Sequence, residues 1–280
     1  MKTDKMRAEK INIGGRDFMT SGHAYVMGIL NVTPDSFSDG GKWISRDAAL
    51  RHVGEMIKDG MDIVDVGGES TRPGHTQISD DEEIERVVPV IEGIKANFDV
   101  PVSIDTYKSG VAKAGISAGA DMINDIWGLK YDRQMGKVIS ESGAACCLMH
   151  NNDNTDYKNF MEEVCSDLEE SLNIAKKAGI KDEKIILDPG VGFGKTYEQN
   201  LEIIGRMDCL LRFGYPLLLG ASRKSVIGLT LDTQVHDRLE GTLVAAVFGV
   251  LKGAMFIRVH DVKENVRAIR MAEAVLGSIR

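Results

Sequence analysis

The sequence has no long hydrophobic run. A membrane-spanning helix needs about 18 or more consecutive apolar residues, and no such stretch occurs in this chain. The first residues, MKTDKMRAEK, are charged and lack the apolar segment of a secretory signal peptide. We therefore expect a soluble, cytoplasmic protein with no membrane partner.

Cysteine is scarce, and its spacing argues against two kinds of site. Cys146, Cys147, Cys165 and Cys209 form no C-x-x-C pair and no zinc-finger pattern. Small secreted proteins that depend on disulfides are much richer in cysteine. We expect free, buried thiols in a reducing compartment.

Proline and aromatic residues are also few, whereas glycine is abundant. The 280 residues include 6 prolines, 30 glycines and only 6% aromatic residues, which fits many tight connections between strands and helices. Hydrophobic residues make up 43% of the chain, enough for a sizeable core. The formal net charge of −8 argues against a general nucleic-acid surface, so an anionic ligand would need a local cluster of basic groups.

One pattern recurs along the chain: a short apolar strand, a polar loop and an amphipathic helix. Eight such units predict a single (β/α)8 TIM barrel, with residues 1–280 as one domain, because parallel strands covered on both faces are almost continuously apolar. An open, doubly wound sheet is the alternative, although it usually has fewer units. A short N-terminal hairpin is expected within Ile11–Thr20. The expected strands are Tyr25–Leu30, Asp62–Val66, Val102–Ile104, Met122–Ile123, Ala145–Met149, Lys184–Leu187, Leu217–Leu219 and Met255–Val259. The expected helices are Ser45–Asp59, Asp80–Lys95, Lys108–Ala118, Tyr131–Ser142, Tyr157–Ala178, Tyr197–Leu211, His236–Lys252 and Val262–Leu276, some with a capping residue such as Ser45 or Ser79.

The first strand of the repeat leads into an oxygen-rich loop. Met27–Gly41 reads M-G-I-L-N-V-T-P-D-S-F-S-D-G-G, and its apolar run ends at Asn31. The oxygens that follow suit a hard cation with a phosphate partner, although an ordinary turn has a similar composition. In a barrel the carboxyl ends of the strands meet at one face, where active sites lie. The polar groups expected at this face are Asn31, Glu69–Arg72, Asp105, Asn124, Asp125, His150, Asp188, Ser222–Ser225 and Arg258–Asp261.

These groups divide by chemistry. Arg258 and His260 are two residues apart and would project to the same side of an extended segment, where they and Asn31 could bind a diphosphate. Alternatively, His260 is a neighbour of a helix start that packing holds in place. Asp105, Asn124 and Asp188 form a second set that needs hydrogen-bond donors if buried, and an amino-pyrimidinone ring supplies them. Lys224 could then donate to the ring oxygen.

The segment Pro189–Thr196 has a misleading motif. It reads P-G-V-G-F-G-K-T and looks like a phosphate-binding loop, but proline stands where that motif requires its first glycine. We therefore interpret it as a glycine-rich barrel loop that presents Phe193 at the mouth, and reject a nucleoside triphosphatase of the P-loop class.

Several segments resemble dihydropteroate synthases, and the resemblance covers essentially the whole chain. Two carry most of the specificity: G-I-L-N-V-T-P-D-S-F-S-D-G-G at Gly28–Gly41 and D-I-V-D-V-G-G-E-S-T-R-P-G at Asp62–Gly74. The others are S-I-D-T from Ser103, I-N-D from Ile123, L-D-P-G from Leu187, S-R-K-S from Ser222 and R-V-H-D from Arg258.

The resemblance implies a folate-pathway transferase that joins a dihydropterin-methyl diphosphate to p-aminobenzoate and releases diphosphate. It implies a pterin site of Asp105, Asn124, Met149, Asp188, Lys224 and Arg258. The implied diphosphate site is Asn31, Arg258 and His260, with Mg²⁺ held by Asn31 and Asp35. The implied p-aminobenzoate site is Thr71, Arg72, Pro73, Phe193, Lys224 and Ser225. The residues expected to act in catalysis are Asn31, Arg72, Asp105, Lys224, Arg258 and His260.

Some questions stay open at the level of sequence. After His150 this chain reads N-N-D-N-T-D-Y, which departs from the family's usual loop and puts the contacts of that loop in doubt. A corrinoid-dependent methyltransferase with the same pterin pocket, or a catalytically silent pterin-binding relative, are the alternative functions. The apolar stretch Leu243–Val250 fits a homodimer interface, or equally a helix buried against its own barrel.

Overall fold

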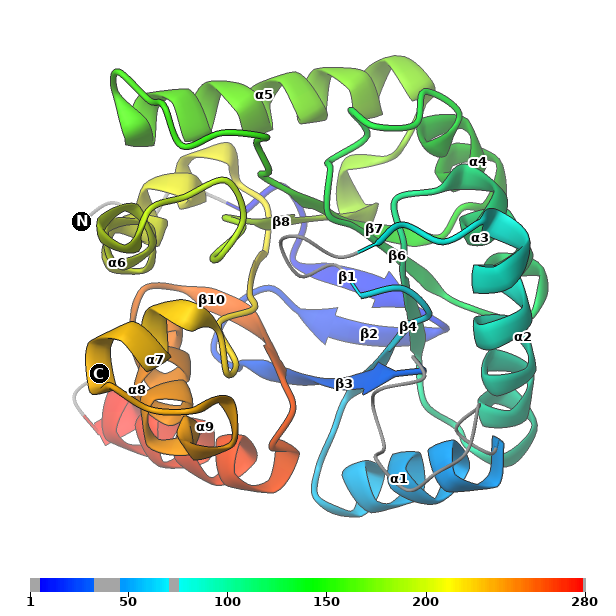
Figure 1. The fold of residues 1–280 in the computed structure, drawn as a ribbon, viewed down its shortest axis with the longest axis horizontal. Coiled ribbons are helices and arrows are strands. Elements are labelled where there is room, and N and C mark those ends of the chain that lie inside the picture. The colour runs from blue at the N-terminus through cyan, green and yellow to red at the C-terminus, as the bar shows by residue number, and fades with distance from the viewer. Residues whose placement is uncertain (1–5, 33–45, 71–75, 279–280) are drawn as a thin grey trace.

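Eight parallel strands close into a barrel, which confirms the predicted fold. The computed structural model describes residues 6–32, 46–70 and 76–278. The strands follow one another around the barrel in chain order, and the last pairs with the first (Figure 1). They are β3 (Tyr25–Asn31), β4 (Ile63–Gly67), β5 (Val102–Asp105), β6 (Met122–Asp125), β7 (Ala145–Met149), β8 (Ile185–Asp188), β9 (Leu217–Leu219) and β10 (Ala254–Val259).

The alternation of side chains along each strand decides which residues reach the barrel interior. On β4, Val64 and Val66 pack outward into the main core beneath the helices, whereas Ile63 belongs to a separate cluster inside the barrel. Successive side chains of a strand point to opposite faces, so Asp65 also points inward. The same alternation directs Asp105 and Asn124 inward. Polar residues in these short buried strands are therefore placed together by the pleat.

The helices surround the barrel, as Figure 1 shows. They are α1 (Arg46–Lys58), α2 (Asp80–Asn97), α3 (Ser109–Ser117), α4 (Met135–Ser142), α5 (Phe160–Ala178), α6 (Tyr197–Arg206), α7 (Ser225–Leu231), α8 (Leu239–Leu251) and α9 (Val262–Ser278). Ser79 caps α2 as predicted, because its side chain accepts a hydrogen bond from the backbone N–H of Glu82. The predicted cap Ser45 lies outside the described residues.

Four predicted helices have wrong boundaries, and one helix was missed. Helix α4 starts four residues later than expected, because Asp132 accepts the N–H groups of Ser109 and Gln134 and holds a turn there. Helix α5 starts later too, since Glu163 accepts two N–H groups before it. Short 3-10 segments occupy 207–213 and 235–237, where continuous helix was expected. The short helix α7 was not predicted.

The N-terminal hairpin covers the barrel end opposite the strands' carboxyl ends. Its strands β1 (Lys10–Ile13) and β2 (Arg16–Met19) are antiparallel, and Gly14 and Gly15 supply the positive φ angles of 60° and 80° that the turn needs. Ile11, Ile13 and Phe18 are buried against residues at the start of the barrel strands. The hairpin therefore fills the floor of the barrel.

Three of the four cysteines are buried, and one is exposed. Cys146, Cys147 and Cys165 are free and buried as expected, but Cys209 is free and exposed, so that part of the prediction was wrong. Cys209 lies on the 3-10 segment at 207–213, where only Met207 and Leu210 are buried.

Within the described residues, no helix has the length and apolarity to cross a membrane.

Candidate functional site

Four strand-borne acids and amides meet inside the mouth of the barrel. Asp105, Asn124 and Asp188 are 6%, 4% and 5% exposed, at the ends of β5, β6 and β8. Asp65 lies one layer deeper on β4 and is fully buried. The structure thus brings together the three predicted acceptors and adds a carboxylate that the sequence analysis had not assigned to the site. A charged residue within the apolar strand D-I-V-D-V was the signal that could have identified Asp65.

Arg258 connects two of these carboxylates. Its Nε donates to Asp65 Oδ2 at 2.6 Å, and its Nη2 donates to Asp105 Oδ2 at 2.6 Å. Asn124 Nδ2 also donates to Asp65 Oδ2, at 3.3 Å. Charge-assisted contacts of this kind are short and strong, and they fix the guanidinium plane. Arg258 therefore lies among the predicted pterin residues, with Asp65 as its deep anchor.

Three acceptor atoms in this cluster have no hydrogen-bond partner among the described residues. They are Asp65 Oδ1, Asp105 Oδ1 and Asn124 Oδ1, all buried on neighbouring strands. Leaving a buried polar atom unsatisfied costs about 1–3 kcal/mol, so such atoms usually have a ligand or water as a partner. The cluster is built to receive N–H donors.

Burial controls the ionisation of these groups. It raises the pKa of Asp105 to about 7, although Arg258 opposes the shift, while Asp65 and Glu83 add to it. Burial also raises the pKa of Asp188, against the attraction of Lys224. In the opposite sense, burial lowers the pKa of Lys224 to about 8. Burial thus favours the protonated form of both carboxyl groups, and for Asp105 it brings the pKa close to neutral pH.

Lys224 and Phe193 form the next part of the mouth. Lys224 precedes α7, its Nζ donates to the carbonyl of Val191, and it lies 4.6 Å from the centre of the Phe193 ring. Phe193 packs against a small apolar cluster that contains Met149, Tyr107 and Ile126. Predicted pterin and p-aminobenzoate residues are thus neighbours. Ser225 is exposed at the first position of α7.

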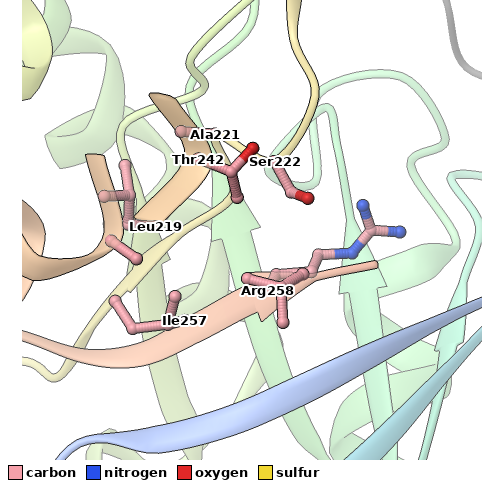
Figure 2. Close-up of a pocket in the computed structure, with 8 residues that line it drawn as sticks. Leu219, Ala221, Ser222, Thr242, Ile257 and Arg258 are labelled. Atoms are coloured by element: carbon pink, nitrogen blue, oxygen red, sulfur yellow. The ribbon is translucent and has the colours of Figure 1, made fainter. Parts of the chain in front are cut away.

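Asn31 and His260 lie at the carboxyl ends of two paired strands, because Asn31 ends β3 and His260 directly follows β10. A methyl group built on Gly67 would lie 3.5 Å from Asp105 Cβ and 3.7 Å from Asn31 Oδ1, so the side chains of Asn31 and Asp105 both lie next to Gly67. Ser222 Oγ lies 2.9 Å from His260 Nδ1 and accepts the His260 backbone N–H at 3.2 Å. Figure 2 shows Ser222 near Arg258, whose guanidinium extends away from Leu219 and Ile257.

Two of the polar residues at strand ends do not join the centre. Asp125 points outward and accepts the N–H groups of Trp127 and Leu129, which makes it the anchor of a turn. Asp261 pairs with Arg223 instead. The predicted site residues Thr71, Arg72, Pro73 and Asp35 lie outside the described residues.

A buried ionic network supports the same rim and was missed by sequence reasoning. Lys108 Nζ lies 2.5 Å from Glu69 and 2.9 Å from Glu83, and it donates to the carbonyl of Ile78 at 2.7 Å. Tyr107 donates to the other oxygen of Glu69 at 2.5 Å. The network ties the end of β4 to the residues before α2.

The sequence is similar to those of known pterin-binding enzymes. The sequence profile of the pterin binding enzyme family matches residues 27–260. The dihydropteroate synthase of Clostridium beijerinckii is 58% identical over 95% of this chain and 99% of its own length. This chain belongs to the dihydropteroate synthase family. The family's Bacillus subtilis member is 51% identical over 90% of this chain and 88% of its own length.

Solved structures of family members have the same fold. One is a dihydropteroate synthase from Clostridium difficile, crystallised in the presence of pteroic acid, with a TM-score of 0.88 and 51% identity over 90% of this chain and 97% of that one. Another is the Xanthomonas albilineans dihydropteroate synthase with 4-aminobenzoic acid, with a TM-score of 0.91 and 38% identity over 96% of this chain and 98% of that one.

Proposed function

We propose that this protein condenses 6-hydroxymethyl-7,8-dihydropterin diphosphate with p-aminobenzoate to give 7,8-dihydropteroate and diphosphate. The observation that carries the proposal is the group of buried acceptors on neighbouring strands that have no hydrogen-bond partner among the described residues, beside Arg258 and Lys224. A dihydropterin is flat, and its ring N–H and amino groups match such acceptors. Family membership supports the same substrates.

The pterin ring would lie between the acceptors and the apolar wall. Asp188 would accept two N–H bonds from the amino-pyrimidinone edge, while Asp105 and Asn124 would bind the opposite part of the ring. Lys224 would donate to the ring oxygen, and Met149 would pack against the ring face. These roles are supported by the positions of Asp105, Asn124 and Asp188 at the carboxyl-terminal parts of β5, β6 and β8, and by Phe193, which contacts both the Met149 cluster and Lys224.

The diphosphate and its metal would bind at the rim formed by Asn31, Arg258 and His260. The Asn31 amide oxygen lies at the end of β3 beside Asp105, and oxygen ligands of this kind suit Mg²⁺, so the residue fits the proposed role. Asp35 would be the second ligand. Bound Mg²⁺ would neutralise negative charge on the diphosphate.

p-Aminobenzoate would bind on the outer side of the pterin, against Phe193, and Thr71 and Pro73 would be further contacts. Lys224 and Ser225 would complete this pocket, and Arg72 would pair with the carboxylate. The p-aminobenzoate amine is neutral at pH 7 and can attack without a strong general base.

The reaction would be a displacement in which bond breaking leads. As the bond between the pterin methylene and oxygen breaks, Arg258 and His260 stabilise the negative diphosphate. Asp105 and Asp188 stabilise the positive charge that develops on the pterin methylene. No covalent intermediate with the enzyme forms, and detection of a pterin-modified side chain by mass spectrometry would contradict this mechanism.

Two other functions fit part of the site. A corrinoid-dependent methyltransferase would need the pterin acceptors but not an aryl-acid pocket at Thr71, Arg72, Pro73 and Ser225, and it would move a methyl group from a methylated folate to cobalamin. A silent pterin-binding relative would bind the pterin without turnover. The sequence contains every residue proposed for the pterin, diphosphate and p-aminobenzoate sites, and this argues against both alternatives.

We further propose a cytoplasmic homodimer in which residues 1–280 of each subunit form one domain. On α8, Thr242, Ala245, Ala246 and Gly249 are buried against the barrel, whereas Val244, Phe248 and Leu251 are exposed. One face of Leu243–Val250 thus packs against its own barrel, and the exposed face is the one that we propose for the dimer interface. A helix that is apolar on all sides favours a partner on its exposed side.

Binding of the pterin tests the acceptor role proposed for Asp188. Asp188→Asn turns one acceptor into a donor, so we expect loss of pterin affinity by about 2–5 kcal/mol. Isothermal titration with 6-hydroxymethyl-7,8-dihydropterin measures this affinity, and near-normal affinity in the variant would contradict the assignment of Asp188 to the pterin site.

Arg258→Ala is expected to reduce turnover and the affinity for diphosphate. If the variant bound diphosphate as tightly as the wild-type protein, Arg258 would not belong to the diphosphate site.

A further inference from the structure

The loop with the misleading phosphate-binding motif is held by its own lysine. Lys195 Nζ lies 2.7 Å from His150 Nδ1, and it donates to the carbonyls of Gly190 at 2.8 Å and Phe193 at 2.9 Å. The lysine that a phosphate-binding loop would direct toward its ligand is therefore directed into the protein. Its contacts join both ends of the segment that carries Phe193.

The backbone of residues 190–194 lies very close to the segment after β7. At two positions of this loop the space admits only glycine. A methyl group on Gly190 would be 1.9 Å from the carbonyl oxygen of His150, and one on Gly194 would be 2.3 Å from the carbonyl oxygen of Asn152. Both glycines also have positive φ angles, 71° and 52°. The backbone therefore rests directly on the segment after β7, and Lys195 reaches across this contact to His150.

His150 gives Lys195 a rigid partner. It is 1% exposed, and its Nε2 lies 3.4 Å from Asp167 Oδ2. Burial lowers the pKa of His150 to about 2 and that of Lys195 to about 7. An ammonium group can donate to all three partners, and a neutral amine can donate to the two carbonyls and accept from Nδ1. The three contacts are therefore compatible with either protonation state of Lys195.

We infer that Lys195 is a positioning residue that holds Phe193 in place as the wall of the p-aminobenzoate pocket. The inference rests on the proposed role of Phe193. Lys195 acts through that residue's own carbonyl, while the Phe193 ring contacts the apolar cluster of Met149, Tyr107 and Ile126 and lies beside Lys224. Lys195 itself would touch no substrate.

A double-mutant cycle tests whether Lys195 acts through Phe193. Lys195→Met keeps the length of the side chain but removes its hydrogen bonds, and we expect a rise of about tenfold in KM for p-aminobenzoate, with a smaller change in kcat. Phe193→Ala should also raise this KM. In the Phe193→Ala background, Lys195→Met should add little, because the ring that it positions is gone. Independent, multiplicative effects would overturn the inference.

Two further variants keep the test decisive. Lys195→Gln retains donors on a shorter side chain, so it should fold where Lys195→Met does not and show an intermediate KM. Lys130→Met is the matched control, because Lys130 pairs with Asp167 on the same wall and, within the part of the chain that the structure describes, no hydrogen bond joins it to residues 190–194. We expect an unchanged KM for p-aminobenzoate in this control, and an increase equal to that of Lys195→Met would contradict the inference.

Hydrogen exchange separates failure of this inference from failure of the proposed function. If Lys195 positions the loop, Lys195→Met should speed exchange of the amides of residues 190–194 in the protein without substrates. Faster exchange together with an unchanged KM in Phe193→Ala would retain the positioning role and reject the p-aminobenzoate role of Phe193. Unchanged exchange would reject the positioning role itself.

Discussion

At the scale of single residues, Asp65 and Arg258 form the deepest polar contact of the site. Asp65→Ala would leave Arg258 Nε and Asn124 Nδ2 without their acceptor. Removing one partner of a buried ion pair costs about 3–5 kcal/mol, so we expect the free energy of unfolding to fall by about that amount. Urea denaturation measures it.

A neighbouring serine provides the control for Asp65→Ala. Ser103 is fully buried on β5, and its hydroxyl has no hydrogen-bond partner among the described residues. Ser103→Ala should therefore change the free energy of unfolding by less than about 1 kcal/mol. Equal effects of the two substitutions would show that the Asp65–Arg258 contact contributes nothing special to stability.

The raised pKa of Asp105 predicts a pH dependence of pterin binding. Burial raises this pKa to about 7, and only the ionised carboxylate can accept hydrogen bonds with both oxygens. Affinity for 6-hydroxymethyl-7,8-dihydropterin, which lacks the titrating diphosphate, should therefore fall as the pH drops below about 7. Titration calorimetry between about pH 5.5 and 8.5 measures it. Constant affinity over that range would contradict the role of Asp105 as an ionised acceptor.

Sequence reasoning located the strand-end residues but not their partners. Asp105, Asn124 and Asp188 were predictable because the pleat and the barrel rule place strand ends at one face. The contact between Arg258 and Asp65 joins residues 193 positions apart, so no local pattern indicates it. The same holds for the contact between Lys195 and His150.

At the scale of elements, the hairpin is expected to stabilise the barrel without contributing to catalysis. Phe18 is 1% exposed, and its ring meets Tyr25 edge-on, with 4.8 Å between the ring centres. Phe18→Ala should lower the free energy of unfolding by about 3–5 kcal/mol, with near-normal activity at low temperature. Met19→Ala is the control on the same strand, because Met19 is 48% exposed. A large loss of kcat in Phe18→Ala at a temperature where it stays folded would contradict the separation.

Helix starts were less predictable than strands for a physical reason. The α5 boundary depends on a carboxylate that accepts backbone N–H groups outside the helix, at Lys158 and Asn159. Such local competition does not change the apolar periodicity on which the prediction was based. Helix α7 is short, and its seven residues cover less than two turns, so no period is visible in the sequence.

At the scale of the whole molecule, α8 and α9 pack against each other, and both carry exposed apolar side chains. Val244, Leu251, Met271 and Val275 are 69%, 55%, 65% and 51% exposed. If these helices form the subunit interface, Val244→Glu should convert a dimer into monomers, which sedimentation velocity measures. Glu55→Lys on α1 is a control that also changes charge on an exposed surface. A monomeric wild-type protein at micromolar concentration would contradict the homodimer.

The most direct test of the central claim is the reaction itself. Purified protein is mixed with 6-hydroxymethyl-7,8-dihydropterin diphosphate, p-aminobenzoate and Mg²⁺, and both products are quantified by chromatography with mass detection. We predict equal amounts of dihydropteroate and diphosphate, formed only when both substrates are present. Binding of the pterin without release of diphosphate, or diphosphate release that does not depend on p-aminobenzoate, would contradict the proposed function.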